Sequence, residues 1–342
     1  MLADTLSTGT AGALFGAALM SSGVWAPQVI TSQLKLQDFY MVKVFLTASA
    51  SSAVALALFE RNGLLACKAK PPASYGWFSP YDGNIIGGAL VGAGMALTDA
   101  CPGTVLLQLI TGIPSARYVL LGGLLGGIIF TRLSPSLHRP PPQDQPRKST
   151  APPALTLPAK LHTDPTLTLL AYDALCAVCI ALAQLCAPST THPLGPVPSG
   201  LLIGAAQLAS AALTRLPLGV SSAYEEAGRW FWHLAALHHT PAPAPAPAPA
   251  TRALTFAAGM LVGSWALARA APGFAETAGG DALRGGAGRA LLGGGVLVFG
   301  ARVAGGCPSG HGISGMAMLS VASVVSVVSM FAGGIAVGLL VG

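Results

Sequence analysis

Long apolar stretches alternate along the chain with short polar or proline-rich segments. An apolar run of about 20 residues is enough for an α-helix to cross the hydrocarbon core of a bilayer, and shorter runs can enter it as re-entrant helices shielded by protein. The pattern therefore predicts an all-α, polytopic membrane protein with about nine transmembrane helices plus short re-entrant helices. The predicted crossings are residues 9–20, 39–59, 84–100, 117–131, 166–187, 199–214, 251–270, 289–305 and 318–341.

The composition supports this interpretation. Of the 342 residues, 52% are hydrophobic and only 9% are charged, whereas soluble globular proteins carry about 25% charged residues. An ordinary soluble enzyme and a disordered chain are both excluded by this balance. The net charge of +6 is spread between the apolar segments and forms no basic patch, so we expect no nucleic-acid partner. We expect a multi-pass protein of the plasma membrane, with the lipid bilayer as its partner.

An internal repeat is visible when the two halves are compared. The stretch Gly88–Gly94 leads to a Cys-Pro pair at 101–102, and Gly294–Gly300 leads in the same register to a Cys-Pro pair at 307–308. An earlier match joins residues 12–18, Gly-Ala-Leu-Phe-Gly-Ala-Ala, to 200–206, Gly-Leu-Leu-Ile-Gly-Ala-Ala. Glycine-rich duplication can also arise from helix packing alone, but packing does not require a Cys-Pro pair.

Whether the number of crossings before the second repeat is odd or even decides how the two repeats would be oriented in the membrane. If each half has four crossings and residues 166–188 form a lone connecting helix, residues 189–342 enter the membrane from the face opposite to residues 1–133. Inverted repeats with broken helices at matching positions are typical of transporters. Residues 134–165 and the Pro-Ala run 241–250 are interpreted as linkers that are exposed and tolerant of deletion.

The two Cys-Pro pairs are the main candidates for chemistry. Proline is tolerated at the first turn of a helix, so Cys101 and Cys307 are expected at helix starts. A helix start favours anions, which would place sulfur beside a bound anion. Gly103, Ser309 and Gly310 are small enough to let the backbone approach a ligand.

Two ionisable residues accompany the second pair. Arg302 could attract a dianion, while His311 could donate a hydrogen bond or accept a proton. The alternatives are that Arg302 satisfies the carbonyl groups of a broken helix and that His311 caps a turn. The sequence does not explain the role of Asp99, which lies close to Cys101, because its carboxylate would repel an anion.

The remaining cysteines carry no recognisable chemistry. Cys67 lies in a short basic loop, and Cys176 and Cys179 form a C-x-x-C in an apolar helix without the strand or the further ligands that redox or zinc sites require. With Cys186, they are interpreted as packing or lipid-facing residues. We expect no metal and no cofactor.

Residues 88–104, with their Cys-Pro-Gly, and residues 300–315 resemble the YeeE/YedE family of sulfur-compound transport proteins, and residues 218–225 resemble its third short loop. The resemblance implies thiosulfate uptake, with thiols at loop tips passing the anion along by S–H hydrogen bonds. Carried over by motif, these thiols are Cys101 and Cys307. The predicted substrate path consists of Cys101, Pro102, Gly103, Arg302, Cys307, Ser309, Gly310, His311, Ser21, Ser22, Ser221 and Ser222.

One departure from the family concerns the first loop. Family members with three path cysteines have a cysteine there, whereas this chain has Ser21 and Ser22, which could bind an anion only through hydroxyl groups. We expect a transporter of thiosulfate or a related sulfur anion, without catalytic residues, whose cargo a cytosolic sulfur-carrier protein could receive. Two alternatives remain open. One is a membrane sulfurtransferase that forms a cysteine persulfide, and the other is a less selective anion channel.

Overall fold

The computed structural model describes residues 2–64, 69–137, 155–187, 194–215, 219–239, 248–276 and 285–341. Within these ranges every named secondary-structure element is a helix and there is no strand, which confirms the predicted all-α class. The helices are α1 (Leu2–Ser21), α2 (Pro27–Leu34), α3 (Tyr40–Arg61), α4 (Asp82–Thr98), α5 (Thr104–Ile110), α6 (Ala116–Leu137), α7 (Leu157–Leu161), α8 (Pro165–Cys186), α9 (Pro196–Thr214), α10 (Ser221–His239), α11 (Arg252–Ala270), η1 (Pro272–Phe274), α12 (Gly286–Val303), η2 (Ser309–Gly315) and α13 (Val321–Val341).

Each of the nine predicted crossings contains a helix, but the described part of the chain has six helices that are long and apolar enough to span a membrane. These six are α3, α6, α8, α9, α11 and α13, and they make the chain an integral membrane protein. The helices α1, α4 and α12 fall outside this set. A helix that is shielded by other helices does not need a uniformly apolar surface, and α4 and α12 pack against each other inside the bundle.

Short helices follow the breaks in the chain, as predicted. The helix α2 has 8 residues, and α5 and the π-helix η2 have 7 residues each. The 19-residue helix α10 was not predicted. Its first half contains two glutamates and an arginine, Glu225, Glu226 and Arg229, so the segment has no long apolar run that would indicate a helix.

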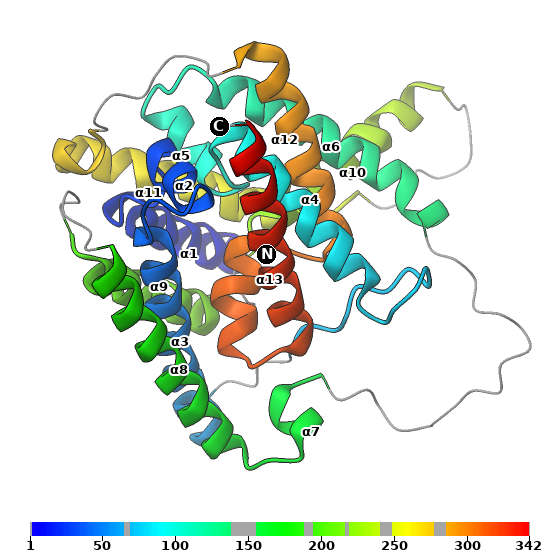
Figure 1. Ribbon diagram of the computed structural model, residues 1–342. Coiled ribbons are helices and arrows are strands. Elements are labelled where there is room, and N and C mark those ends of the chain that lie inside the picture. The colour runs from blue at the N-terminus through cyan, green and yellow to red at the C-terminus, as the bar shows by residue number, and fades with distance from the viewer. Residues whose placement is uncertain are drawn as a thin grey trace, which may run out of the picture.

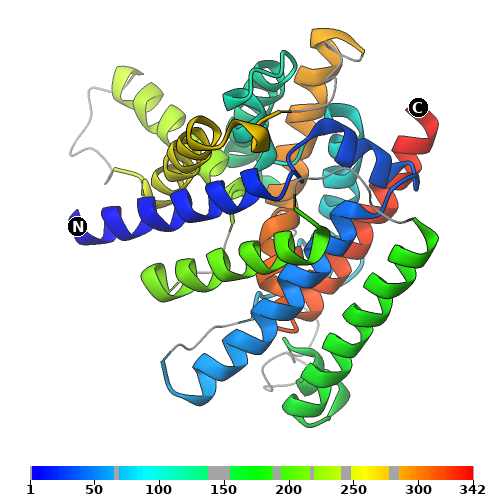
Figure 2. The ribbon, with the colours of Figure 1, turned by 90° about the vertical axis from the view of Figure 1, so that its left-hand side faces the viewer.

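The bundle is arranged in two layers of closely packed helices. In Figure 1, α4, α12 and α13 stand side by side at the centre, with α6 behind α12. In Figure 2, α1, α9 and α11 lie side by side in a second layer, and α3 crosses next to α9. The approach is close because glycines face the neighbouring backbone. A Cβ atom at Gly92 of α4 would lie 1.9 Å from the carbonyl oxygen of Met330 in α13. The high glycine content therefore serves helix packing.

The helix α8 lies at the edge of the bundle in both views and packs mainly against α3 (Figures 1 and 2). Of its three cysteines, Cys176 is buried, Cys179 is half-buried and Cys186 is exposed. Leucine side chains cover the outward face, where lipid is expected. This placement agrees with the interpretation of these cysteines as packing or lipid-facing residues.

Both ends of the predicted linker 134–165 pack against or belong to helices. Residues 134–137 belong to α6, and residues 155–158 are half-buried or buried. Leu157 N–H donates to the Leu319 carbonyl at 2.8 Å, and Val321 N–H donates to the Leu155 carbonyl at 3.1 Å. The turn before α13 has free backbone groups, and an extended segment satisfies them. Cys67 and the predicted linker residues 138–154 and 241–247 lie outside the described residues.

Candidate functional site

The first Cys-Pro break lies between α4 and α5. Asp99 ends α4 in the left-handed region, with φ 54°, and Cys101 follows three residues before α5 begins. Cys101 N–H donates to Thr104 Oγ1 at 2.7 Å, and Thr104 N–H donates to Cys101 Sγ at 3.4 Å. The thiol is buried in the protein interior and does not face lipid. These local hydrogen bonds hold the sulfur in one orientation.

The second break lies between α12 and η2. Gly305, with φ 77°, reverses the chain after α12, and the sulfur of Cys307 lies 3.2 Å from Ser309 Oγ. Only 1% of Cys307 is exposed. The backbone N–H groups of Gly310 and Ser221 also point toward this sulfur. The predicted Ser309 hydroxyl is thus directed at the thiol itself.

The first turn of α10 connects the two breaks. Tyr224 Oη donates to the Pro102 carbonyl at 2.9 Å, and a Cβ atom at Gly103 would lie 3.5 Å from Val220. Ser221, in the same turn, reaches toward Cys307 through its backbone N–H. Cys101 and Cys307, which are far apart in sequence, therefore approach the same few residues.

Arg302 does not face the site as an isolated charge. It forms an ion pair with Glu225, and its Nη1 donates to Ser221 Oγ at 3.4 Å. The side chains of Arg302 and Glu225 are only 14% and 12% exposed, so water screens the pair weakly. Glu225 therefore offsets part of the attraction that Arg302 could exert on a dianion. The sequence indicated Arg302 but not Glu225, whose partner lies 77 positions away in the chain.

His311 connects three helices through its two ring nitrogens. Its Nδ1 lies 3.0 Å from Ser323 Oγ, and its Nε2 lies 3.0 Å from the Ala304 carbonyl. A carbonyl oxygen can only accept, so Nε2 carries the proton and Nδ1 accepts from Ser323. The ring is 1% exposed. Of the two predicted roles, the structure therefore supports the capping role, because neither nitrogen is left for a substrate.

The serines of the first loop serve the end of α1. Ser21 Oγ donates to the Ala18 carbonyl at 2.9 Å, and Ser22 Oγ donates to the Leu19 carbonyl at 2.8 Å. Their hydroxyl protons are therefore already engaged with the helix. Ser222 is half-buried beside Ser221. The structure thus brings the predicted residues of the second half to the cysteines, whereas Ser21 and Ser22 cap a helix.

Lys70 is a residue that the sequence analysis missed. It lies in the segment between α3 and α4, yet its ammonium group reaches the second break. A Cβ atom at Gly306 would lie 2.7 Å from Lys70 Nζ and 2.8 Å from His311 Nε2. Burial lowers the pKa of Lys70 to about 8, Cys307 opposes this shift, and Arg302 adds to it. No local motif distinguishes this lysine from the other cations of the loops, because its neighbours come from distant parts of the chain.

A comparison with known protein families shows to which family this chain belongs. The sulphur transport family matches residues 21–336, which include both Cys-Pro breaks and the first turn of α10. The chain belongs to the sulphur transport family. This membership confirms the resemblance to YeeE/YedE proteins and, with the apolar helices, supports a membrane transporter of sulfur compounds. No curated protein matches the chain.

In this sulphur transport protein, Asp99 acts as a link between α2 and α5. Thr31 Oγ1 donates to its carboxylate at 2.6 Å, and Gln108 Nε2 donates to its carbonyl at 2.9 Å. The carboxylate lines a polar cavity of about 320 Å³ together with Lys35 and Arg289. Cations at this cavity can balance the charge of Asp99, which answers the question that the sequence left open.

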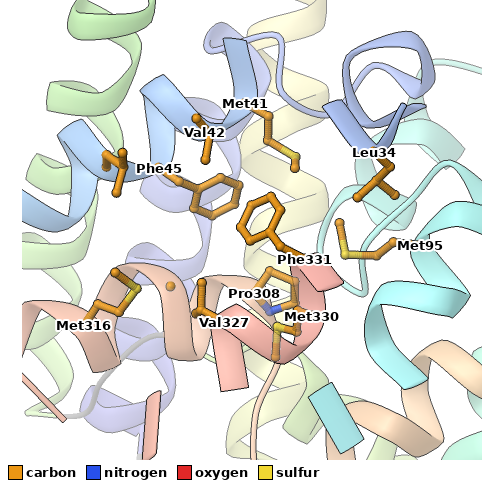
Figure 3. A pocket seen from close by; sticks show the side chains of 12 residues that line it. Leu34, Met41, Val42, Phe45, Met95, Pro308, Met316, Val327, Met330 and Phe331 are labelled. Atoms are coloured by element: carbon orange, nitrogen blue, oxygen red, sulfur yellow. The ribbon is translucent and has the colours of Figure 1, made fainter. Parts of the chain in front are cut away.

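A second cavity lies behind the second break and is apolar (Figure 3). It measures about 50 Å³, and Pro308 of the break forms part of its wall. The rings of Phe45 and Phe331 face each other across it. The cavity is bounded by α3, α13, η2 and the ends of α2 and α4, with no charged residue in its lining. An inorganic dianion would lose its hydration there without replacement, so this cavity does not hold the cargo.

Proposed function

We propose that this member of the sulphur transport family takes up thiosulfate or a related inorganic sulfur anion across the plasma membrane. The anion passes between Cys101 and Cys307 by hydrogen bonds from their thiol groups. The observation that carries the proposal is that both thiols are buried and both breaks contact the first turn of α10. A buried thiol next to a polar turn can donate to an anion that has left water.

The proposed architecture is a pair of inverted repeats, residues 1–133 and 189–342, with α8 between them. The helix contacts support it because they occur in matching pairs. The helix α1 packs against α11 as α9 packs against α3, and α4 packs against α13 as α12 packs against α6. The pairs α1 with α9 and α4 with α12 contact each other, as expected for elements next to a two-fold axis. Likewise, α5 contacts α11 as η2 contacts α3.

Hydrogen-bonded transfer is favoured over a persulfide intermediate by the surroundings of Cys307. A sulfurtransferase needs a base that can take the thiol proton. His311, the base closest in sequence, is engaged through both nitrogens by Ser323 and Ala304. The thiol instead lies 3.2 Å from the hydroxyl of Ser309. With His311 engaged, hydrogen bonding by the thiol is favoured over persulfide formation.

Uptake of labelled thiosulfate into liposomes that contain the purified protein tests the proposal. We expect saturable uptake that unlabelled thiosulfate inhibits and that equal concentrations of sulfate or chloride inhibit much less. Equal inhibition by all three anions would favour the unselective channel instead. Mass spectrometry of the protein after exposure to thiosulfate should show unmodified cysteines, because stable sulfur addition to Cys101 or Cys307 would indicate a sulfurtransferase. The cytosolic sulfur-carrier partner stays a prediction, which co-purification can test.

A further inference from the structure

The two ends of the proposed path differ in their balance of charge. At the second break Arg302 is paired with Glu225, so the two charges offset each other. Lys70 reaches the same break, and none of the carboxylates in the described ranges forms an ion pair with it. The second break therefore has one positive charge in excess, next to a buried thiol.

The usual structural role of such a cation is to satisfy the carbonyl groups at the end of a helix. The end of α12 does not need it. The carbonyl of Ala301 accepts from Gly306 N–H at 2.8 Å, and the carbonyl of Arg302 accepts from Gly305 N–H at 3.2 Å. The carbonyl of Ala304 accepts twice, from His311 Nε2 at 3.0 Å and from Asn84 Nδ2 at 3.2 Å. The carbonyls of Ala301, Arg302 and Ala304 are thus already satisfied without Lys70.

One donor of the Arg302 guanidinium at this break is unused. The Nε–H group of Arg302 is buried and has no acceptor among the described residues. Burial of donors without acceptors is costly in a protein interior, and a charged donor costs more than a neutral one. This unused guanidinium donor and the ammonium group of Lys70 lie at the same break, which indicates that a bound anion supplies the missing acceptor.

We propose that Lys70, with the Nε–H of Arg302 and the thiol of Cys307, forms the binding subsite for the divalent sulfur anion. This inference rests on the proposed transport function. Lys70 supplies the positive charge that is not neutralised by the protein, and the oxygen atoms of the anion accept from the ammonium and guanidinium groups. The sulfhydryl of Cys307 donates the third hydrogen bond. The path is therefore asymmetric, with its charged binding step at the second break.

The variants K70Q and K70R separate charge from shape. We expect K70Q to raise the KM for thiosulfate about tenfold or more, as loss of a charge-assisted hydrogen bond does, while K70R stays close to the wild type. K160Q is the matched control, because Lys160 is an exposed lysine of α7 that packs over the ring of Tyr81. It should leave the KM unchanged. A K70Q protein that transports with the wild-type KM would overturn the inference.

The pH dependence gives a second readout that a purely structural lysine would not produce. The groups that face Lys70 are Cys307, Arg302 and His311. Between pH 7 and pH 9 thiosulfate keeps its charge, whereas Lys70, with its pKa lowered to about 8, becomes neutral. Thiosulfate affinity of the purified protein should therefore fall more steeply over this range in the wild type than in K70R, because arginine stays protonated whereas ionisation of the Cys307 thiol affects both proteins. The same decline in both proteins would contradict the role of Lys70.

The outcomes distinguish this inference from the proposed function. If the wild-type protein neither binds nor transports thiosulfate, the proposed function fails before Lys70 is considered. If the wild type transports thiosulfate and K70Q does so equally well, only the subsite assignment fails. If K70Q does not fold, the comparison of K70R with the wild type between pH 7 and pH 9 still decides the question.

Discussion

The two Cys-Pro breaks have the same backbone plan but different chemical surroundings. At the first, Cys101 is held by Thr104, and the hydrogen bonds to its thiol and backbone come from neutral groups. At the second, Cys307 is near Lys70 and the ion pair of Arg302 with Glu225. Two breaks of similar backbone can therefore each place a thiol before a short helix, while the side chains make only one of them cationic.

The difference arises partly from the helices that enter each site. The helix α10 has 19 residues and brings Tyr224 to the first break and Glu225 to the second. The helix α2, its counterpart in the proposed repeat, has 8 residues. The longer helix covers one side of the bundle, whereas on the other side the shorter helix ends beside the apolar cavity. The two helices thus differ in length, and the two breaks differ in charge.

The largest expected effect comes from removal of the thiols. Cys307→Ala and Cys101→Ala should each lower thiosulfate uptake by about tenfold or more, since each removes a donor to a charged ligand. The loss should be greater for Cys307→Ala, because that thiol belongs to the cationic end. Liposome uptake at equal protein content is the measurement, and Cys186→Ala, at the exposed end of α8, is the control. Normal uptake by both variants would remove the thiols from the mechanism.

An intermediate effect is expected for the ion pair at the second break. Glu225 also pairs with Arg229, so Arg302→Gln leaves the carboxylate with a partner. Glu225→Gln instead leaves the mostly buried Arg302 without one and should lower the free energy of unfolding by about 3 kcal/mol. Thermal unfolding in detergent should therefore show a lower midpoint for Glu225→Gln than for Arg302→Gln.

The double variant of Glu225 and Arg302 is the control for this ordering. It removes both charges and should recover part of the stability that Glu225→Gln loses, because no unpaired buried guanidinium remains. Equal midpoints for the two single variants, or no recovery in the double variant, would show that the pair does not determine stability at this break.

The smallest effect is expected at the neutral break. Thr104→Val removes the oxygen that accepts from Cys101 N–H and should lower the free energy of unfolding by about 1 kcal/mol. Thr111→Val, at the residue directly after α5, is the matched control. The Thr111 hydroxyl donates to carbonyls, so its loss leaves no donor unsatisfied. Thermal unfolding of the two variants compares them directly. If Thr104→Val is as stable as Thr111→Val, Thr104 does not hold this break in place.

Much of the fold could be predicted because it depends on local composition. Apolar runs of helical length indicated nine helices, and the Cys-Pro pairs indicated where the chain breaks before α5 and η2. The helix α10 could not be predicted in this way, because its glutamates and arginine interrupt the apolar run. The hydrogen bonds of Leu155 and Leu157 with the turn before α13 could not be predicted either, because they join distant parts of the chain.

The sequence by itself determined that this is a membrane protein. It also showed that helices are interrupted at two Cys-Pro pairs and that the two halves of the sequence resemble each other. These properties follow from residue types and their spacing, which act locally. Only the tertiary structure decided that Glu225 offsets Arg302, that His311 is fully engaged, and that Lys70 reaches Cys307. Electrostatic and hydrogen-bonding partners are chosen by proximity in space, and helix packing creates that proximity between residues far apart in the chain.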